Sequence, residues 1–181
     1  MIRYTMGTVD NENMGNWEQV MENQNKVRLF KIATWATFYT ATIVAASSAG
    51  LWDIKGYYAE LTSPSFAPPN WLFGPVWTIL YVFVATIGFR LVYMAKDAWK
   101  PLLIALWTLQ FCLNTIWTPV FFGAYNLGAA LIYIVALDVV VLAFIALIWN
   151  KDRISAYLAI PYLAWISFAS ILNASFWMLN G

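Results

Sequence analysis

Histidine is absent from this chain of 181 residues, and cysteine occurs once, as Cys112. Without histidine the protein lacks the commonest general base, the commonest metal ligand and the usual axial ligand of haem iron. A single cysteine cannot form an intramolecular disulfide, and no zinc site of the Cys/His type can be built. We therefore expect no metal site and no obligatory cofactor.

Charged residues are also scarce, at 10% of the chain against 62% hydrophobic residues. A membrane-spanning helix needs about 20 mostly apolar residues. Five runs meet this condition, near residues 32–51, 71–94, 102–122, 127–149 and 154–179. The sequence predicts an all-α integral membrane protein, a bundle of five transmembrane helices within residues 26–181, with the lipid bilayer as partner and no nucleic acid. The spans leave no room for a soluble catalytic domain.

Residues 1–25 are polar and rich in Asn and Glu. Such a segment buries too little surface to fold alone, so we expect a flexible tail. A partner-binding or targeting segment is the alternative.

Basic residues lie mostly on one side of the predicted membrane. The side opposite the tail carries only Lys55. The tail side carries Arg3, Lys26, Arg28, Lys31, Arg90, Lys96, Lys100, Lys151 and Arg153. By the positive-inside rule, the N-terminus is predicted to be cytoplasmic and the C-terminus to lie across the membrane.

Two of the apolar runs contain polar and aromatic residues at helical spacing. Gln110, Asn114, Trp117 and Phe121 share one face of the third run. The fifth run repeats the pattern with Trp165, Ala169 and Asn173, after a proline at Pro161 that should bend or loosen the helix. These faces favour either a pocket for a flat, largely apolar ligand or amides that hold helices together. The residues alone leave both interpretations open.

The fourth run contains an acid, Asp138, near its middle. An ionised side chain there costs at least ~2.5–3.5 kcal/mol, so the carboxyl group must be protonated, hydrated or paired. It is a candidate for a proton or ion path, with a hydrogen-bonded structural role as the alternative. Arg90 lies one turn from its helix end and is predicted to snorkel to the headgroups.

The longest connector, residues 52–70, contains three prolines that force extended or turn geometry, Pro64, Pro68 and Pro69. Together with Phe66 they predict a stiff loop that caps one mouth of the bundle. An interfacial aromatic belt is the alternative interpretation of the aromatic residues here.

Three stretches resemble the signature of the translocator protein family, also called the tryptophan-rich sensory proteins. They are YAELTSPSFAPPNWLFGPVW at residues 58–77, QFCLNTIWTPVFFG at residues 110–123 and PYLAWISFASILN at residues 161–173. The resemblance covers about residues 32–180.

This resemblance implies a five-helix bundle, commonly dimeric, that binds porphyrins such as protoporphyrin IX, sterols and synthetic flat ligands in a pocket closed by the first loop. A receptor with a regulatory or transport role follows from it. The alternatives are light-dependent porphyrin degradation using Trp77 and Trp165, and proton-coupled transport using Asp138. The pocket residues that the resemblance implies are Phe73, Val76, Trp77, Asn114, Trp117, Trp165, Ala169 and Leu172.

The sequence departs from the family pattern at several positions. Ser63 replaces the usual lysine before the first loop proline, and Phe66 replaces the usual tryptophan after it. Ala129 stands where animal members place a pocket tryptophan. Residues 173–178 lack the tyrosine and the basic residue of a proposed cholesterol motif, which argues against high-affinity sterol binding.

Overall fold

The structure, a computed structural model, describes residues 11–48, 52, 54–95 and 97–181. All secondary-structure elements among these residues are helices, and none of them is a strand. The α-helices are α1 (Asn11–Ser48), α2 (Ile54–Glu60), α3 (Phe73–Tyr93), α4 (Lys100–Thr118), α5 (Leu127–Ile148) and α6 (Arg153–Asn180). A 3-10 turn, η2 (Asn70–Leu72), precedes α3, and a π-helical turn, η3 (Pro119–Gly123), continues α4.

The chain divides into two compact units, Met1–Thr37 and Phe38–Gly181. The described part of the first unit is helix, including residues 11–25, and the flexible tail expected for residues 1–25 stays a prediction. This segment contains no proline and is rich in Glu, Gln and Met, which are good helix formers. Lys26 and Glu22 form an ion pair at i,i+4 spacing, 2.8 Å long, on its exposed surface. Residues 1–10 lie outside the described residues.

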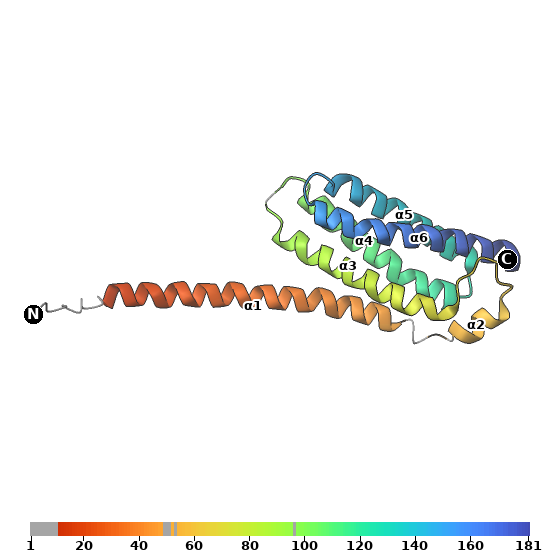
Figure 1. Ribbon diagram of the computed structural model, residues 1–181, viewed down its shortest axis with the longest axis horizontal. Coiled ribbons are helices and arrows are strands. Elements are labelled where there is room, and N and C mark those ends of the chain that lie inside the picture. Colours follow the sequence, from red (N-terminus) through yellow and green to blue (C-terminus); the bar gives the residue numbers. More distant parts are fainter. Residues whose placement is uncertain (1–10, 49–51, 53, 96) are drawn as a thin grey trace, which may run out of the picture. The chain divides into compact units, whose positions relative to one another are not determined.

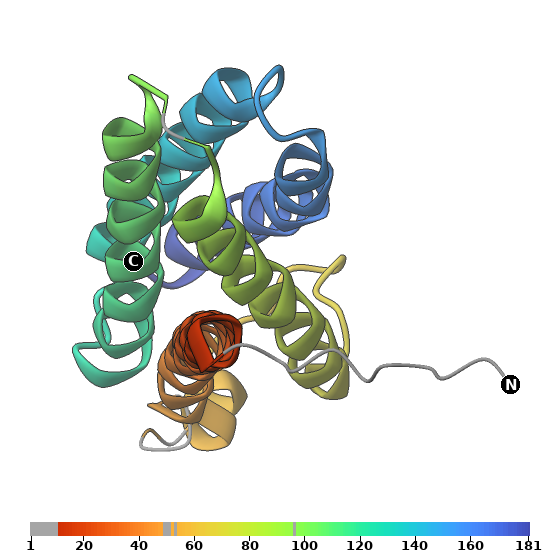
Figure 2. The same ribbon diagram turned by 90° about the vertical axis from the view of Figure 1, so that its left-hand side faces the viewer.

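In the second unit, α3, α4, α5 and α6 run side by side (Figure 1) and pack as a bundle (Figure 2). Four of the six buried residues of α3, at spacings of four, three and four, form one stripe: Leu80, Val84, Ile87 and Leu91. They belong to a core shared with α4, α5 and α6. Large apolar side chains on the outer surface remain exposed, for example Ile132 and Val139, as expected for helices in lipid.

Two side chains fix where the last helices begin. The Asn126 side chain accepts a hydrogen bond from the Ala129 N–H at the start of α5. At the start of α6, Asp152 does the same for Ser155. These caps satisfy backbone donors that have no partner within the helix. Beyond the second cap, α6 is continuous through Pro161.

Four helical segments are long and apolar enough to cross a membrane: Asn70–Tyr93, Lys100–Gly123, Leu127–Ile148 and Arg153–Asn180. They match four of the five predicted spans to within about two residues. Of the remaining predicted span, residues 32–48 are helical in α1, which is not among the four, and residues 49–51 lie outside the described part of the chain.

Candidate functional site

A cavity of about 460 Å³ lies where the start of α3 and the ends of α4 and α6 meet. These helix ends share the end of the bundle with α2 and the C-terminus (Figure 1). None of the described residues that line the cavity carries a charge. The lining consists of Tyr58, Asn70, Phe73, Gly74, Trp77, Thr78, Tyr81, Asn114, Trp117, Thr118, Phe121, Phe122, Ala169, Leu172, Asn173 and Phe176.

Half of the lining residues are aromatic, and their rings contact one another. The rings of Trp77 and Tyr81 have centroids 5.4 Å apart, and those of Trp117 and Phe121 are 5.0 Å apart. Tyr58 lies 5.3 Å from Phe176. Offset and edge contacts of this kind add to the burial energy of each ring and limit its movement. The cavity therefore has walls that are largely formed before any ligand enters.

The π-helical turn η3 brings two adjacent phenylalanines into this region. Pro119 has no N–H for the regular α-helical ladder, and the chain from Pro119 onward follows the wider π pattern. The Ala124 N–H donates to the Pro119 carbonyl at 2.8 Å. Phe121 and Phe122 are both buried as a result, with 1% and 6% of their surface exposed.

Two of the three asparagines that line the cavity, Asn114 and Asn173, also connect helices. Asn114 on α4 accepts a hydrogen bond from the Tyr81 hydroxyl at 3.1 Å and donates to the Tyr162 hydroxyl at 2.9 Å. Tyr162 in turn donates to the Gln110 side-chain oxygen at 2.9 Å. These bonds join α3, α4 and α6, so one amide both lines the cavity and fixes the packing around it.

Asn173 on α6 is held in the same way. It accepts from the Trp117 indole N–H at 3.1 Å and donates to the Leu127 carbonyl at 2.9 Å. The two interpretations that the sequence left open, pocket and helix contact, therefore both describe these amides.

Most of the predicted pocket residues line the cavity. Two do not, Val76 and Trp165, which pack against the bundle core beside it. The Trp165 ring contacts Phe73, with centroids 5.8 Å apart, and its indole N–H is buried without a hydrogen-bond partner. The six that line the cavity are Phe73, Trp77, Asn114, Trp117, Ala169 and Leu172.

The sequence interpretation did not include several lining residues. Tyr81 lies one helical turn after Trp77, and Phe176 lies one turn after Leu172, so helical spacing could have indicated both. Tyr58 comes from α2, and no spacing rule links that helix to α6. Its position follows only from the folded chain.

The loop predicted to cap the bundle packs at the cavity, but its prolines do not line it. Pro64 is buried, and its carbonyl accepts a hydrogen bond from the Ala67 N–H. Phe66 is 48% exposed, and its ring lies 6.4 Å from that of Phe168. Pro68 is partly buried and Pro69 is exposed. Burial of the Tyr58 side chain on this loop raises the pKa of its hydroxyl.

Asp138 lies outside the cavity lining and bonds to α6. The hydroxyl groups of Ser167 and Ser170 donate to its two carboxyl oxygens, at 3.0 and 2.6 Å. A carboxyl group in lipid gains the internal partners that it needs from this arrangement.

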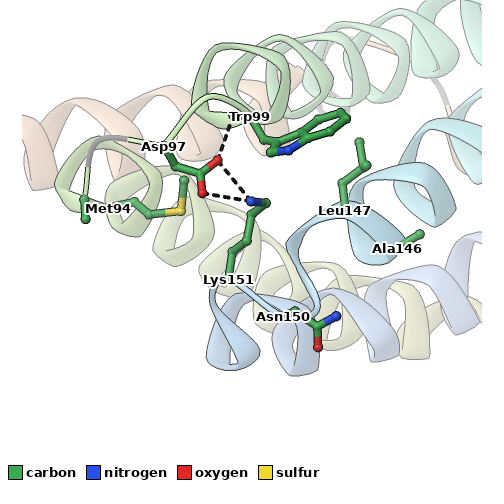
Figure 3. A pocket seen from close by; sticks show the side chains of 8 residues that line it. Met94, Asp97, Trp99, Ala146, Leu147, Asn150 and Lys151 are labelled. Carbon is green, nitrogen blue, oxygen red and sulfur yellow. Dashed lines mark hydrogen bonds and ion pairs between the residues drawn. The ribbon is translucent and has the colours of Figure 1, made fainter.

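A second cavity, of about 530 Å³, lies at the opposite end of the bundle. Figure 3 shows Lys151 beside Asp97, to which it donates at 2.8 Å, and close to Trp99. The Lys151 ammonium is 5.9 Å from the centre of the Trp99 ring. Hydrogen bonds from Lys151 and from the Trp99 backbone hold the pKa of Asp97 below its usual value. No predicted site residue lies here.

Arg90 is also at this end, where it forms an ion pair, and its snorkelling to the headgroups stays a prediction. Its guanidinium donates two hydrogen bonds to the Asp152 carboxylate, at 2.8 and 2.7 Å. A planar guanidinium matches both carboxylate oxygens at once, which makes this a strong form of ion pair. The partner comes from the α5–α6 connection, so it could not be identified within the second span.

Fold and cavity together define a multi-pass helical membrane protein with an aromatic-walled pocket between its helices. Comparison with known sequences then gives the family: residues 31–178 match the TspO/MBR family, and the chain belongs to it.

Relatives come from bacteria, archaea and animals. Protein CrtK of Rhodobacter capsulatus is 33% identical over 82% of this chain and 94% of its own length. The tryptophan-rich protein TspO of Archaeoglobus fulgidus is 39% identical over 71% of this chain and 82% of its own. The human translocator protein is 36% identical over 68% of this chain and 75% of its own length.

Proposed function

We propose that this protein is a membrane receptor for porphyrins and related flat hydrophobic ligands, with a regulatory or transport role. The observation that carries the proposal is the uncharged cavity with aromatic walls. A tetrapyrrole has broad apolar faces that stack on Trp, Tyr and Phe rings. Its polar edge would meet the remaining hydrogen-bonding capacity of Asn114 and Asn173. Relatives named as translocator and tryptophan-rich sensory proteins are consistent with such a role.

The proposal includes five membrane spans, with residues 32–51 as the first. Within the second unit, Phe38 packs edge-on against Trp107 at 5.0 Å, and Tyr39 hydrogen-bonds Thr86 at 2.8 Å. These contacts attach the last turns of α1 to α3 and α4. With the basic residues predominantly on one side, the N-terminus is cytoplasmic and the C-terminus lies across the membrane. The homodimer remains an expectation from the family resemblance.

The geometry favours binding over the two alternatives. Degradation was predicted to use Trp77 and Trp165, but only Trp77 lines the cavity. Transport was predicted to use Asp138, whose carboxyl oxygens are engaged by two serine hydroxyls away from the cavity lining. We therefore assign no catalytic residue, and we treat the porphyrin as a ligand and not as a cofactor.

A titration of the purified protein with protoporphyrin IX, followed by tryptophan quenching in darkness and then under light, tests the proposal. We expect saturable quenching, weakened about two- to tenfold by Trp77→Phe because part of a stacking contact is lost. Trp165→Phe should have a smaller effect. Trp149→Phe, at the opposite end of the bundle, is the matched control and should bind as the wild type does.

Absence of saturable quenching would overturn the proposal. Loss of the porphyrin absorption band under light, dependent on Trp77, would replace binding with degradation as the function.

A further inference from the structure

The last residue of α6, Asn180, binds both backbone polar groups of one loop residue. Its side-chain oxygen accepts from the Thr62 N–H at 2.7 Å, and its NH₂ group donates to the Thr62 carbonyl at 3.1 Å. The same NH₂ group donates to the Phe176 carbonyl at 2.8 Å. Asn180 lies two residues beyond the part of the chain that matches the family.

The segment that Asn180 holds contributes one side chain, Tyr58, to the lining of the cavity. Tyr58, four residues before Thr62, lines the cavity and contacts Phe122 and Phe176. Leu61, directly before Thr62, packs against the same aromatic cluster. On the other side of Thr62, Pro64 is buried. A bond to the Thr62 backbone therefore fixes the loop between its two buried anchor points.

The helix side of this contact is equally close to the cavity. Phe176 lies one turn before Asn180 and is itself a lining residue, with 1% of its surface exposed. Because one amide group bonds to Phe176 and to Thr62, it ties the loop directly to a helical turn that lines the cavity next to Tyr58.

We propose that Asn180 is a positioning residue, a latch that holds the loop at residues 57–67 closed over the cavity and sets how fast a ligand enters and leaves. The kinetic part of this inference rests on the proposed function. Opening the loop breaks two hydrogen bonds to Thr62, whose groups then bond to water. Each such hydrogen bond shifts the equilibrium between the closed and the open loop about two- to tenfold, and bonds at exposed positions lie at the low end of this range because water competes for them. Loss of the latch should therefore raise the open fraction about three- to tenfold.

Hydrogen exchange on the intact protein without ligand tests the latch itself. We expect Asn180→Ala to accelerate exchange in residues 57–67 about three- to tenfold. Thr62→Ala is the matched control, since both backbone groups remain. Ser175→Ala removes a comparable bond near the end of α6, to the Ile171 carbonyl, and should leave the loop unchanged. Equal exchange in Asn180→Ala and wild type would overturn the latch.

Stopped-flow mixing with protoporphyrin IX then tests the kinetic consequence. A latch that only gates access should, when removed, raise the association and dissociation rate constants by the same factor and leave Kd unchanged. A weaker Kd with an unchanged association rate would contradict gating, because it indicates damage to the pocket. Accelerated exchange in Asn180→Ala, combined with no porphyrin binding by any variant, would retain the latch and reject the proposed ligand.

Discussion

Asp152 combines two structural tasks in one carboxylate. It accepts both hydrogen bonds from Arg90 and also caps α6, where the Ser155 hydroxyl donates to it at 2.7 Å. Burial raises the pKa of this group, but the hydrogen bonds from Arg90 and Ser155 and the charge of Arg90 outweigh burial. The pKa therefore lies below the ordinary value of 3.8.

This lowered pKa predicts an acid-sensitive contact. The carboxylate stabilises the folded protein fully above pH 3.8, its unfolded pKa, and the contribution is lost as the pH falls through the lower folded pKa. We expect Asp152→Asn to lower the free energy of unfolding by roughly 1.5–3 kcal/mol at neutral pH, because a charged hydrogen-bond acceptor is removed.

Thermal unfolding between pH 7 and pH 3 checks this expectation. The difference in Tm between wild type and Asp152→Asn should shrink below pH 3.8. Glu18→Gln, on the exposed part of α1, is the control and should have the Tm of the wild type at every pH. A constant difference across the whole range would show that Asp152 acts without its charge.

The sequence predicts individual polar residues better than their partners. Helical spacing placed Gln110 and Asn114 on one face, and they do share the buried side of α4. Their partner Tyr162 lies 48 or more residues away on α6. Spacing rules operate within one helix, so they cannot identify a contact made by tertiary packing. The Arg90 and Asp152 pair was missed for the same reason.

At the scale of whole helices, hydrophobic length predicted most boundaries. The four span candidates begin and end close to their apolar runs because the apolar residues must stay within the hydrocarbon core, away from the water on both sides of the membrane. Two features were not predictable in this way. α1 begins at Asn11, within a polar segment that apolar length cannot detect. The π-helical turn η3 arises after Pro119, where the apolar run continues without change.

Gly88 permits a close approach between helices. A Cβ atom at this position would lie 2.6 Å from carbons of the Phe38 ring and 2.8 Å from Trp107. The Trp107 indole N–H is fixed by a hydrogen bond to the Val84 carbonyl at 2.9 Å, so this ring has little freedom to move. Two aromatic rings can therefore pack over α3 only where the side chain is a hydrogen atom.

Gly88→Ala should accordingly lower the free energy of unfolding by about 1–3 kcal/mol, the usual cost of adding a methyl group to a filled core. Gly74→Ala is the matched control, because a Cβ atom there has nothing within 4 Å. Parallel thermal melts of the two variants make the comparison. Equal Tm values would mean that the contact at Gly88 is looser than described.

Considered as a whole, the bundle has two chemically different ends. Ion pairs gather where the α3–α4 and α5–α6 connections meet, between Arg90 and Asp152 and between Lys151 and Asp97. The uncharged aromatic cavity occupies the other end. On the proposed topology the charged end is cytoplasmic, so a ligand would reach the cavity from the opposite side or from the lipid. The Asn180 latch lies at the cavity end of the bundle.

Blocking the cavity is the most direct test of the claim that the ligand binds there. Ala169 lines the cavity, whereas Ala164, on the same helix, is exposed on the outer surface. A leucine at position 169 would occupy ligand space, and at position 164 it would meet only lipid. In a dark titration with protoporphyrin IX, Ala169→Leu should weaken binding by about tenfold or more, the effect of roughly 1.4 kcal/mol, and Ala164→Leu should bind as the wild type does. Unchanged binding by Ala169→Leu would contradict the claim and place the ligand elsewhere on the protein.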